Sequence, residues 1–251
     1  MGFAAIIIGD EIIRGKRQDK HFARLLEMLT ARGLGLDSVT YVGDNPQRLT
    51  AVLKHSFATD DVVFCFGGIG ITPDDRTRQC AADAVGLPLE VHPEAEKEIR
   101  AFLVEMKREP TDDVFQFGAY PRGSRVIRNP VNRIPGFSFQ HHHFVPGFPQ
   151  MAWPMVEWVL ETYYARLFHQ VQELEKACIV WEGNEGTLID LMRRIETDFP
   201  GTTVFSLPSF GDETMRRHVE LGVRGAPDQV NAAYSVMLAE VAALGFEIQA
   251  L

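Results

Sequence analysis

Short runs of uninterrupted apolar residues alternate with helical patterns in the first part of the chain. Residues 3–8 and 62–66 are apolar at every position, which is typical of strands buried on both faces of a sheet. Residues 39–42 indicate another strand between them. The pair Asn45-Pro46 then suits the cap and first residue of a helix. This alternation predicts an α/β fold, a three-layer α/β/α arrangement around a doubly wound, mostly parallel sheet.

Further helices are expected where apolar residues recur at spacings of three and four. They are residues 22–29, a helix beginning near Pro73, residues 92–108 and a long aromatic-rich helix over 151–168. Between residues 110 and 148 the pattern is irregular, apart from short alternating pieces such as 125–127. We expect the aromatic side chains of 151–168 to pack in the core or in a subunit interface.

The last third of the chain has a different pattern. Strand-like segments at 177–181, 202–207, 218–223 and 246–249 enclose two helical stripes, one before Pro200 and one after Pro227. Their order is βαββαβ, the ferredoxin-like split motif. We therefore predict two domains, a larger one over residues 1–171 and a small α+β domain over residues 172–251.

Composition narrows the class of protein. The chain has 251 residues, 45% hydrophobic and 24% charged, which excludes a disordered or fibrous protein. It carries 34 acidic and 25 basic residues, so a uniformly basic nucleic-acid surface is not expected. The first apolar run is too short for a signal peptide or a membrane span, and the three separated cysteines fit reduced thiols. We expect a cytoplasmic protein with neither membrane nor nucleic-acid partners.

The strongest candidate for chemistry is the glycine loop, Gly67–Gly70, directly after the apolar run 62–66. Gly67, Gly68 and Gly70 let the backbone turn sharply and approach a ligand closely. A helix N-terminus after such a loop binds anions such as phosphate. A Rossmann fingerprint needs a further glycine where Pro73 stands, and the chain has no Gly-Lys-Ser or Gly-Lys-Thr of a P-loop. The loop therefore predicts another kind of phosphate site.

Two acids follow this loop, Asp74 and Asp75. They disfavour direct contact with phosphate but suit a Mg²⁺ ion lying between carboxylate and phosphate oxygens. A structural alternative stays open, because Thr72 and Asp75 have the spacing of a capping box and acids are stabilised at helix N-termini.

Acidic loops after three expected strands favour the functional interpretation. Residues 9–11 and 43–45 each contain a glycine followed by an aspartate. Because ligands bind beyond the carboxyl ends of parallel strands, Asp10, Asp44 and Asp75 should converge on one edge of the sheet. The candidate cations for a phosphorylated ligand are Lys16, Arg17 and Lys20.

Histidines are weaker candidates. His141, His142 and His143 are adjacent, and neighbouring residues of a strand point to opposite faces, so they are not expected to bind one metal ion. We expect a surface strand or loop there, and a half-exposed His21.

Several motifs together resemble a known family. They are Gly9-Asp10-Glu11 with Gly15, Val42-Gly43-Asp44, Gly67-Gly68-Ile69-Gly70 through Asp74-Asp75-Arg76-Thr77, and Val145-Pro146-Gly147-Phe148-Pro149. In this order they resemble the MoaB/Mog-type molybdopterin-binding domain, in the version at the N-terminus of the competence/damage-inducible CinA family. The resemblance covers about residues 3–170, and the segment 172–251 resembles the small domain that follows in CinA proteins.

The resemblance implies a site for a phosphorylated pterin, such as molybdopterin, or for a nucleotide diphosphate. It also implies cleavage of a pyrophosphate bond, as in ADP-ribose, with Mg²⁺ or another divalent metal. The implied catalytic residues are Asp75 and Asp44, and the implied metal ligands are Asp10, Asp74 and Asp75. The implied ligand and phosphate contacts are Gly9, Asp10, Glu11, Gly67, Gly68, Gly70, Thr72, Arg133, Pro146 and Gly147. A homo-oligomer, dimer or trimer, is expected, and deamidation of nicotinamide mononucleotide is not, because the chain stops before the amidohydrolase domain.

Departures from the family pattern keep alternatives open. The chain has Gly70-Ile71-Thr72 in place of Gly-Pro-Thr, Asp19-Lys20-His21 in place of Asp-Thr-Asn, and Asn132-Arg133-Ile134 in place of Gly-Thr-Ala. One alternative is a protein that binds molybdopterin or a nucleotide without turnover. Another is an assembly module whose working surface is the aromatic helix over 151–168.

Overall fold

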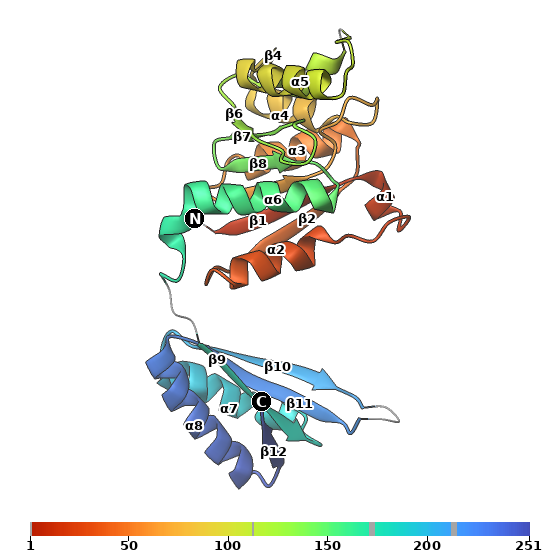
Figure 1. The fold of residues 1–251 in the computed structure, drawn as a ribbon. Helices are drawn as coiled ribbons and strands as arrows, with labels where there is room; N and C mark the ends of the chain where they lie inside the picture. The colour runs from red at the N-terminus through yellow and green to blue at the C-terminus, as the bar shows by residue number, and fades with distance from the viewer. Residues whose placement is uncertain (1, 112, 171–173, 212–214) are drawn as a thin grey trace. The chain divides into compact units, whose positions relative to one another are not determined.

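The computed structural model describes residues 2–111, 113–170, 174–211 and 215–251. The chain divides into two compact units, residues 1–170 and 171–251 (Figure 1). Each unit is described by itself. Among the described helices, none is both long enough and apolar enough to cross a bilayer.

The first unit is built on a mixed six-stranded sheet with the order β2-β1-β3-β8-β7-β6. Its strands are β1 (Phe3–Ile8), β2 (Ser38–Val42), β3 (Val62–Phe66), β6 (Arg125–Ile127), β7 (Gly136–Phe139) and β8 (His142–Val145). Strands β2, β1, β3 and β8 are parallel, β7 pairs antiparallel with β8, and β6 pairs antiparallel with β7 at the edge. The carboxyl ends of four parallel strands therefore meet at one edge of the sheet, where their loops gather.

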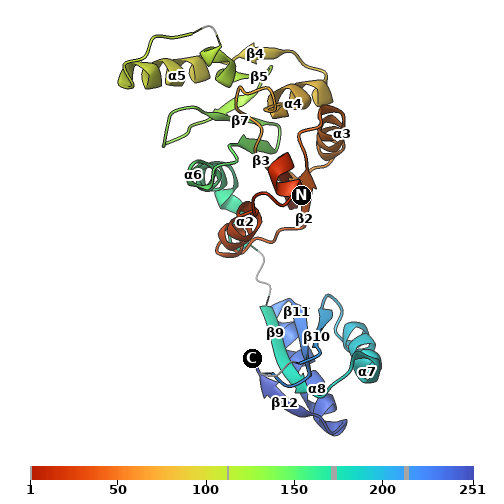
Figure 2. The ribbon, with the colours of Figure 1, turned by 90° about the vertical axis from the view of Figure 1, so that its right-hand side faces the viewer.

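Helices cover both faces of this sheet (Figure 2). They are α2 (His21–Thr30) and α6 (Pro149–Val159) on one face, and α3 (Pro46–Ser56), α4 (Thr77–Val85) and α5 (Pro93–Glu105) on the other. Successive β1 residues serve opposite faces: Ile7 packs with α2 and α6, and Ile6 with α3 and α4. This is why β1 is apolar throughout. The predicted three-layer α/β/α class is confirmed.

Shorter elements complete the first unit. They are α1 (Asp10–Ile13), β4 (Leu89–Val91), the 3₁₀ helix η1 (Val114–Gly118), β5 (Ala119–Pro121), the π-helical η2 (Leu160–Tyr164) and the 3₁₀ helix η3 (Ala165–Leu167). The segment predicted as irregular therefore contains four strands. The long helix predicted over 151–168 was also wrong in form, since α6 begins at Pro149 and passes into a π segment at Leu160.

The expectation of a surface position for the histidine run was wrong for His142 and His143, whereas His141 is exposed. His142 and His143 lie in β8 and are 1% and 0% exposed, because β8 pairs with β3 and β7 on its two sides. The His142 Nε2 atom lies 2.7 Å from Ser56 Oγ. His143 lies between two hydroxyls, 2.8 Å from Ser138 Oγ and 2.7 Å from Tyr164 Oη. Hydroxyl partners satisfy both ring nitrogens of His143 and the Nε2 atom of His142 inside the core, while the buried His142 Nδ1 has no partner within the described residues.

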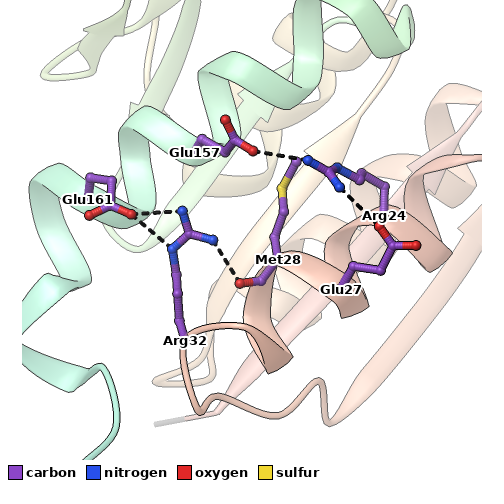
Figure 3. Close-up of polar contacts among 6 residues, drawn as sticks. All are labelled: Arg24, Glu27, Met28, Arg32, Glu157 and Glu161. Carbon is purple, nitrogen blue, oxygen red and sulfur yellow. Dashed lines mark hydrogen bonds and ion pairs between the residues drawn. The ribbon is translucent and has the colours of Figure 1, made fainter.

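Ion pairs hold α2 against the α6–η2 segment (Figure 3). Arg24 donates to Glu157 of α6 at 3.2 Å. Arg32 donates to Glu161 at 2.7 and 3.0 Å and to the Met28 carbonyl at 2.8 Å. These contacts join α2 to the α6–η2 segment on one face of the sheet.

The second unit is an antiparallel four-stranded sheet with the order β10-β11-β9-β12. Its elements are β9 (Leu174–Trp181), α7 (Glu185–Asp198), β10 (Thr203–Ser209), β11 (His218–Gly225), α8 (Pro227–Ala243) and β12 (Glu247–Ala250). Both helices pack on the Cys178, Val180 and Leu221 face. The order β9-α7-β10-β11-α8-β12 is the predicted βαββαβ motif.

Candidate functional site

The loops after β1 and β2 hold each other through two aspartates. The Asp10 amide donates to Asp44 Oδ2 at 2.8 Å, and the Asp44 amide donates to Asp10 Oδ1 at 3.2 Å. A Cβ atom on Gly43 would lie 2.3 Å from Asp10 Oδ1, so a side chain at this position would displace that carboxylate. The predicted convergence of Asp10 and Asp44 is therefore present. It rests on two reciprocal hydrogen bonds, each from the backbone amide of one residue to the carboxylate of the other.

The glycine loop after β3 is fixed by the start of α4. The Thr77 hydroxyl donates to the Gly67 carbonyl at 3.0 Å, and the Thr77 amide donates to the Gly68 carbonyl at 3.0 Å. The Arg78 guanidinium donates to the Gly70 carbonyl. Three loop carbonyls thus turn toward the protein.

The loop amides have a different environment. The Gly67 amide donates to the Val145 carbonyl of β8 at 3.0 Å. For Gly68 and Gly70, no acceptor is found within the residues that the structure describes. Backbone amides left without protein acceptors in a glycine turn are suited to an anion such as phosphate. Gly67 and Gly68 have φ angles of 107° and 65°, which only glycine adopts without strain.

The residues after the loop form a turn and not a helix. Helix α4 begins at Thr77, so the expected start near Pro73 was wrong. Asp75 Oδ2 accepts hydrogen bonds from the Thr72 amide at 3.0 Å and from the Thr72 hydroxyl at 2.5 Å. The Asp75 amide donates to the Thr72 carbonyl at 2.9 Å. The Thr72–Asp75 pairing therefore exists, but it closes a separate turn before the helix.

Negative charge accumulates at this edge of the sheet. Burial raises the pKa of the Asp44 carboxyl, the hydrogen bond from the Asp10 amide lowers it, and the charges of Asp10, Glu11 and Asp74 raise it. Asp74, which is exposed, accepts a hydrogen bond from the Thr72 hydroxyl that lowers the pKa of its carboxyl. Asp75 lies against the glycine loop, since a Cβ on Gly70 would be 2.2 Å from its Oδ2.

The predicted metal ligands do not form a complete set. Across the described residues, no three His, Cys, Asp or Glu side chains are grouped closely enough to hold a metal ion. The set Asp10, Asp74 and Asp75 is therefore not assembled by the protein alone. Mg²⁺ commonly uses one or two carboxylates and completes its shell with water and phosphate oxygens, which this cluster still permits.

The loop after β8 forms the other side of the site. A Cβ atom on Gly147 would lie 3.4 Å from the Gly67 Cα, so the two loops pass close to each other. His21, the first residue of α2, stacks on Phe66 with ring centroids 4.4 Å apart, and its Nε2 lies 3.1 Å from the Gly147 carbonyl. Burial lowers the pKa of His21. The expectation of a half-exposed His21 was wrong, since the residue is 5% exposed.

Arg133 is directed elsewhere. Its Nε lies 3.0 Å from Glu105 Oε2 and its Nη1 lies 3.5 Å from Glu98 Oε2, both on α5. These residues line a separate cavity of about 600 Å³. The structure therefore does not place Arg133 with the glycine loop. Lys16, Arg17 and Lys20 are exposed after β1.

Sequence reasoning missed two residues of the site, Thr77 and Arg78, and underestimated the burial of His21. All three are buried beside its loops. The sequence did contain a signal for Thr77, because Thr77 is the last residue of the glycine-loop motif on which the family resemblance is based. Arg78 had none, since a charged residue in the first turn of a helix is ordinarily solvated.

An α/β/α sheet whose carboxyl edge carries a glycine turn and acidic loops defines a ligand-binding domain of the doubly wound class. A model of the family described as the probable molybdopterin binding domain matches residues 4–166. That match covers more than half of the 251 residues, so the chain belongs to the molybdopterin-binding domain family.

Individual relatives point to the CinA-like group. The chain is 31% identical over 165 residues to a putative competence-damage inducible protein of Caldanaerobacter subterraneus, with 64% of this chain and 40% of that protein aligned. It is 28% identical over 247 residues to a protein of the same description from Moorella thermoacetica, with 94% of this chain and 58% of the relative aligned. The chain thus spans about half the length of these relatives.

The solved structure of a CinA protein of unknown function from Thermoplasma acidophilum is also similar. Its TM-score is 0.57 at 22% identity, over 64% of this chain and 96% of that chain. At this identity the similarity shows a shared fold. The resemblance predicted from the motifs is confirmed.

Proposed function

We propose that the first unit binds a phosphorylated pterin or nucleotide, with its phosphates at the glycine loop. The observation that carries this proposal is the orientation of the loop: its carbonyls are held by Thr77 and Arg78, and the amides of Gly68 and Gly70 lack acceptors within the described residues. Membership of the molybdopterin-binding domain family supports the pterin as one ligand class.

We further propose that this site cleaves a nucleotide pyrophosphate bond, as in ADP-ribose. A water oxygen attacks one phosphorus, the bridging phosphorus–oxygen bond breaks, and the bridging oxygen leaves with the other phosphate. The proton of the water passes to a carboxylate. Asp44 suits this role because burial raises its pKa toward the range in which a general base is most effective. Asp75 lies against the glycine loop, where the phosphates would sit.

A divalent cation fits the donor chemistry of this edge. Burial raises the pKa of Asp44, and the charges of Asp10, Glu11 and Asp74 raise it further. Hard carboxylate oxygens are the ligands that Mg²⁺ prefers. When bound, the cation would neutralise phosphate charge. Asp10 would hold it, together with water and phosphate oxygens of the substrate.

Incubation of the purified protein with ADP-ribose or FAD, with and without Mg²⁺ or Co²⁺, tests this activity. We expect metal-dependent release of mononucleotides, lost in Asp75→Asn and retained in the matched control Asp83→Asn on the exposed side of α4. Hydrolysis that is unchanged in Asp75→Asn would remove Asp75 from the catalytic role.

A binding protein without turnover is the second candidate. It is favoured by the hydrogen bonds that already occupy Asp75 and by the incomplete set of metal ligands among the described residues. Calorimetry with ADP or a pterin phosphate separates the two candidates. Tight binding with no product over hours supports the binding protein, and metal-dependent product supports the enzyme.

A further inference from the structure

Arg78 is a buried cation beneath the glycine loop. It is 2% exposed, although it lies in the first turn of α4. Its guanidinium donates to the Gly70 carbonyl. Its Nε is buried and, within the described residues, has no hydrogen-bond partner. Arginine keeps its charge in proteins, so a full positive charge is held here with few partners.

Neighbouring residues compensate this charge only in part. Burial lowers the pKa of Arg78, and the charge of Asp75 opposes that shift. The neighbouring Tyr120 is a neutral phenol, because burial raises the pKa of its hydroxyl. However, Asp75 Oδ2 accepts two hydrogen bonds from Thr72, and Tyr120 donates its own hydroxyl proton to the Pro135 carbonyl at 2.8 Å. A buried charge without full pairing is costly in a folded protein. An anion at the adjacent loop would reduce that cost.

Arg78 contacts the same loop that carries the free amides. The carbonyl it contacts belongs to Gly70, and the Gly70 amide, like that of Gly68, has no acceptor within the described part of the chain. The guanidinium therefore fixes the orientation of this peptide segment and adds a positive charge behind it. Because the charge is buried, salt screens it much less than an exposed lysine or arginine.

We propose that Arg78 is a positioning residue that supplies the fixed positive charge for the phosphate at the glycine loop. This inference rests on the proposed phosphate binding and adds to it the cation that the site requires. Arg78 acts from behind the loop and does not contact the ligand. The exposed Lys16, Arg17 and Lys20 are not required for this role.

Calorimetric titration with inorganic pyrophosphate, at low and at high NaCl, tests the proposal on the full chain. Arg78→Gln removes the charge but keeps a hydrogen-bond donor for the Gly70 carbonyl. Arg78→Lys keeps the charge. The matched control is Arg76→Gln. It also removes one positive charge, but from an exposed side chain two residues before Arg78. Adenosine and ADP serve as further probes, since only ADP carries phosphate.

We expect Arg78→Gln to bind pyrophosphate at least about tenfold more weakly at both salt concentrations, because a buried charge is poorly screened. Arg78→Lys should stay within about threefold of the unchanged protein. Arg76→Gln should lose less than about threefold at low salt and nothing at high salt. The loss in Arg78→Gln should appear with ADP and be absent with adenosine.

Three results would overturn the proposal. They are equal pyrophosphate affinity of Arg78→Gln and the unchanged protein, a loss that disappears at high salt, or an equal loss with adenosine, which would indicate a collapsed loop. If Arg78→Gln does not fold by circular dichroism, a folded Arg78→Lys with a tenfold loss would also overturn it. Absence of pyrophosphate and ADP binding by the unchanged protein would instead refute the proposed function.

Discussion

The buried histidines of β8 predict that the first unit loses stability in mild acid. Burial lowers the pKa of His142 to about 4 and of His143 to about 3, against about 6.5 in an unfolded chain. Between these values the unfolded chain binds more protons than the folded one. The free energy of unfolding therefore falls as the pH drops below about 6.5 and continues to fall toward about 3.

The size of the effect follows from these shifts. At pH 5 each imidazole is mostly protonated in the unfolded chain and mostly neutral in the folded one. Each then lowers the free energy of unfolding by about 2 kcal/mol relative to pH 7.5, or about 4 kcal/mol for the two together. His21 adds to the loss, because burial lowers its pKa as well. A decrease of this size is a large fraction of the stability of an ordinary domain.

Urea unfolding followed by tryptophan fluorescence measures this loss. Trp181 lies in the second unit, so Trp181→Phe leaves Trp153 and Trp158 to report on the first unit. In this background, His143→Gln should reduce the loss between pH 7.5 and pH 5 by about 2 kcal/mol. Comparison between variants cancels the contribution of the carboxyl groups.

His141→Gln is the matched control, because His141 is the exposed neighbour of the two buried rings. It should keep the full loss of stability. A loss in His143→Gln as large as in the background protein would refute the reasoning, because burial would then not be the cause of the pH dependence.

Three further predictions concern the loops around the site. Asn45→Ala removes the side chain that caps α3 by accepting from its first turn at 3.0 Å, and should lower the free energy of unfolding by about 1 kcal/mol in urea titrations. Thr77→Val removes the 3.0 Å hydrogen bond to the Gly67 carbonyl and should cost about 1–2 kcal/mol in the same assay. Gly70→Ala places a carbon 2.2 Å from an Asp75 oxygen and should weaken pyrophosphate binding about tenfold by calorimetry. Unchanged values for any of these variants would contradict the contact on which it rests.

The local sequence pattern alone was sufficient to predict elements such as the fully buried strands, in which every residue is apolar. Residues 3–8 and 62–66 became the neighbouring strands β1 and β3, because an unbroken apolar run must be covered on both faces. Asn45 caps α3 as expected, since a capping bond joins residues three positions apart. The βαββαβ order of the second unit was equally evident from alternation and turn residues.

Strand β8 could not be recognised in the same way. Its first two residues, His142 and His143, suggested a surface segment. They are buried because β3 and β7 flank the strand and because Ser56, Ser138 and Tyr164 provide hydroxyl partners. Two of these partners, Ser56 and Tyr164, are distant in sequence, so no local pattern contains them.

The candidate site also combines features that the sequence predicted with features that depend on the tertiary structure. The sequence by itself placed glycines and aspartates after successive parallel strands, and the topology of such sheets is enough to bring those loops to one edge. Only the tertiary structure decided how they are held: Asp10 and Asp44 exchange hydrogen bonds, Asp75 closes its own turn, and Arg133 pairs with α5. It also buried Arg78 beneath the loop. Burial and charge pairing depend on residues far apart in the chain, whereas strand and cap signals arise between neighbours.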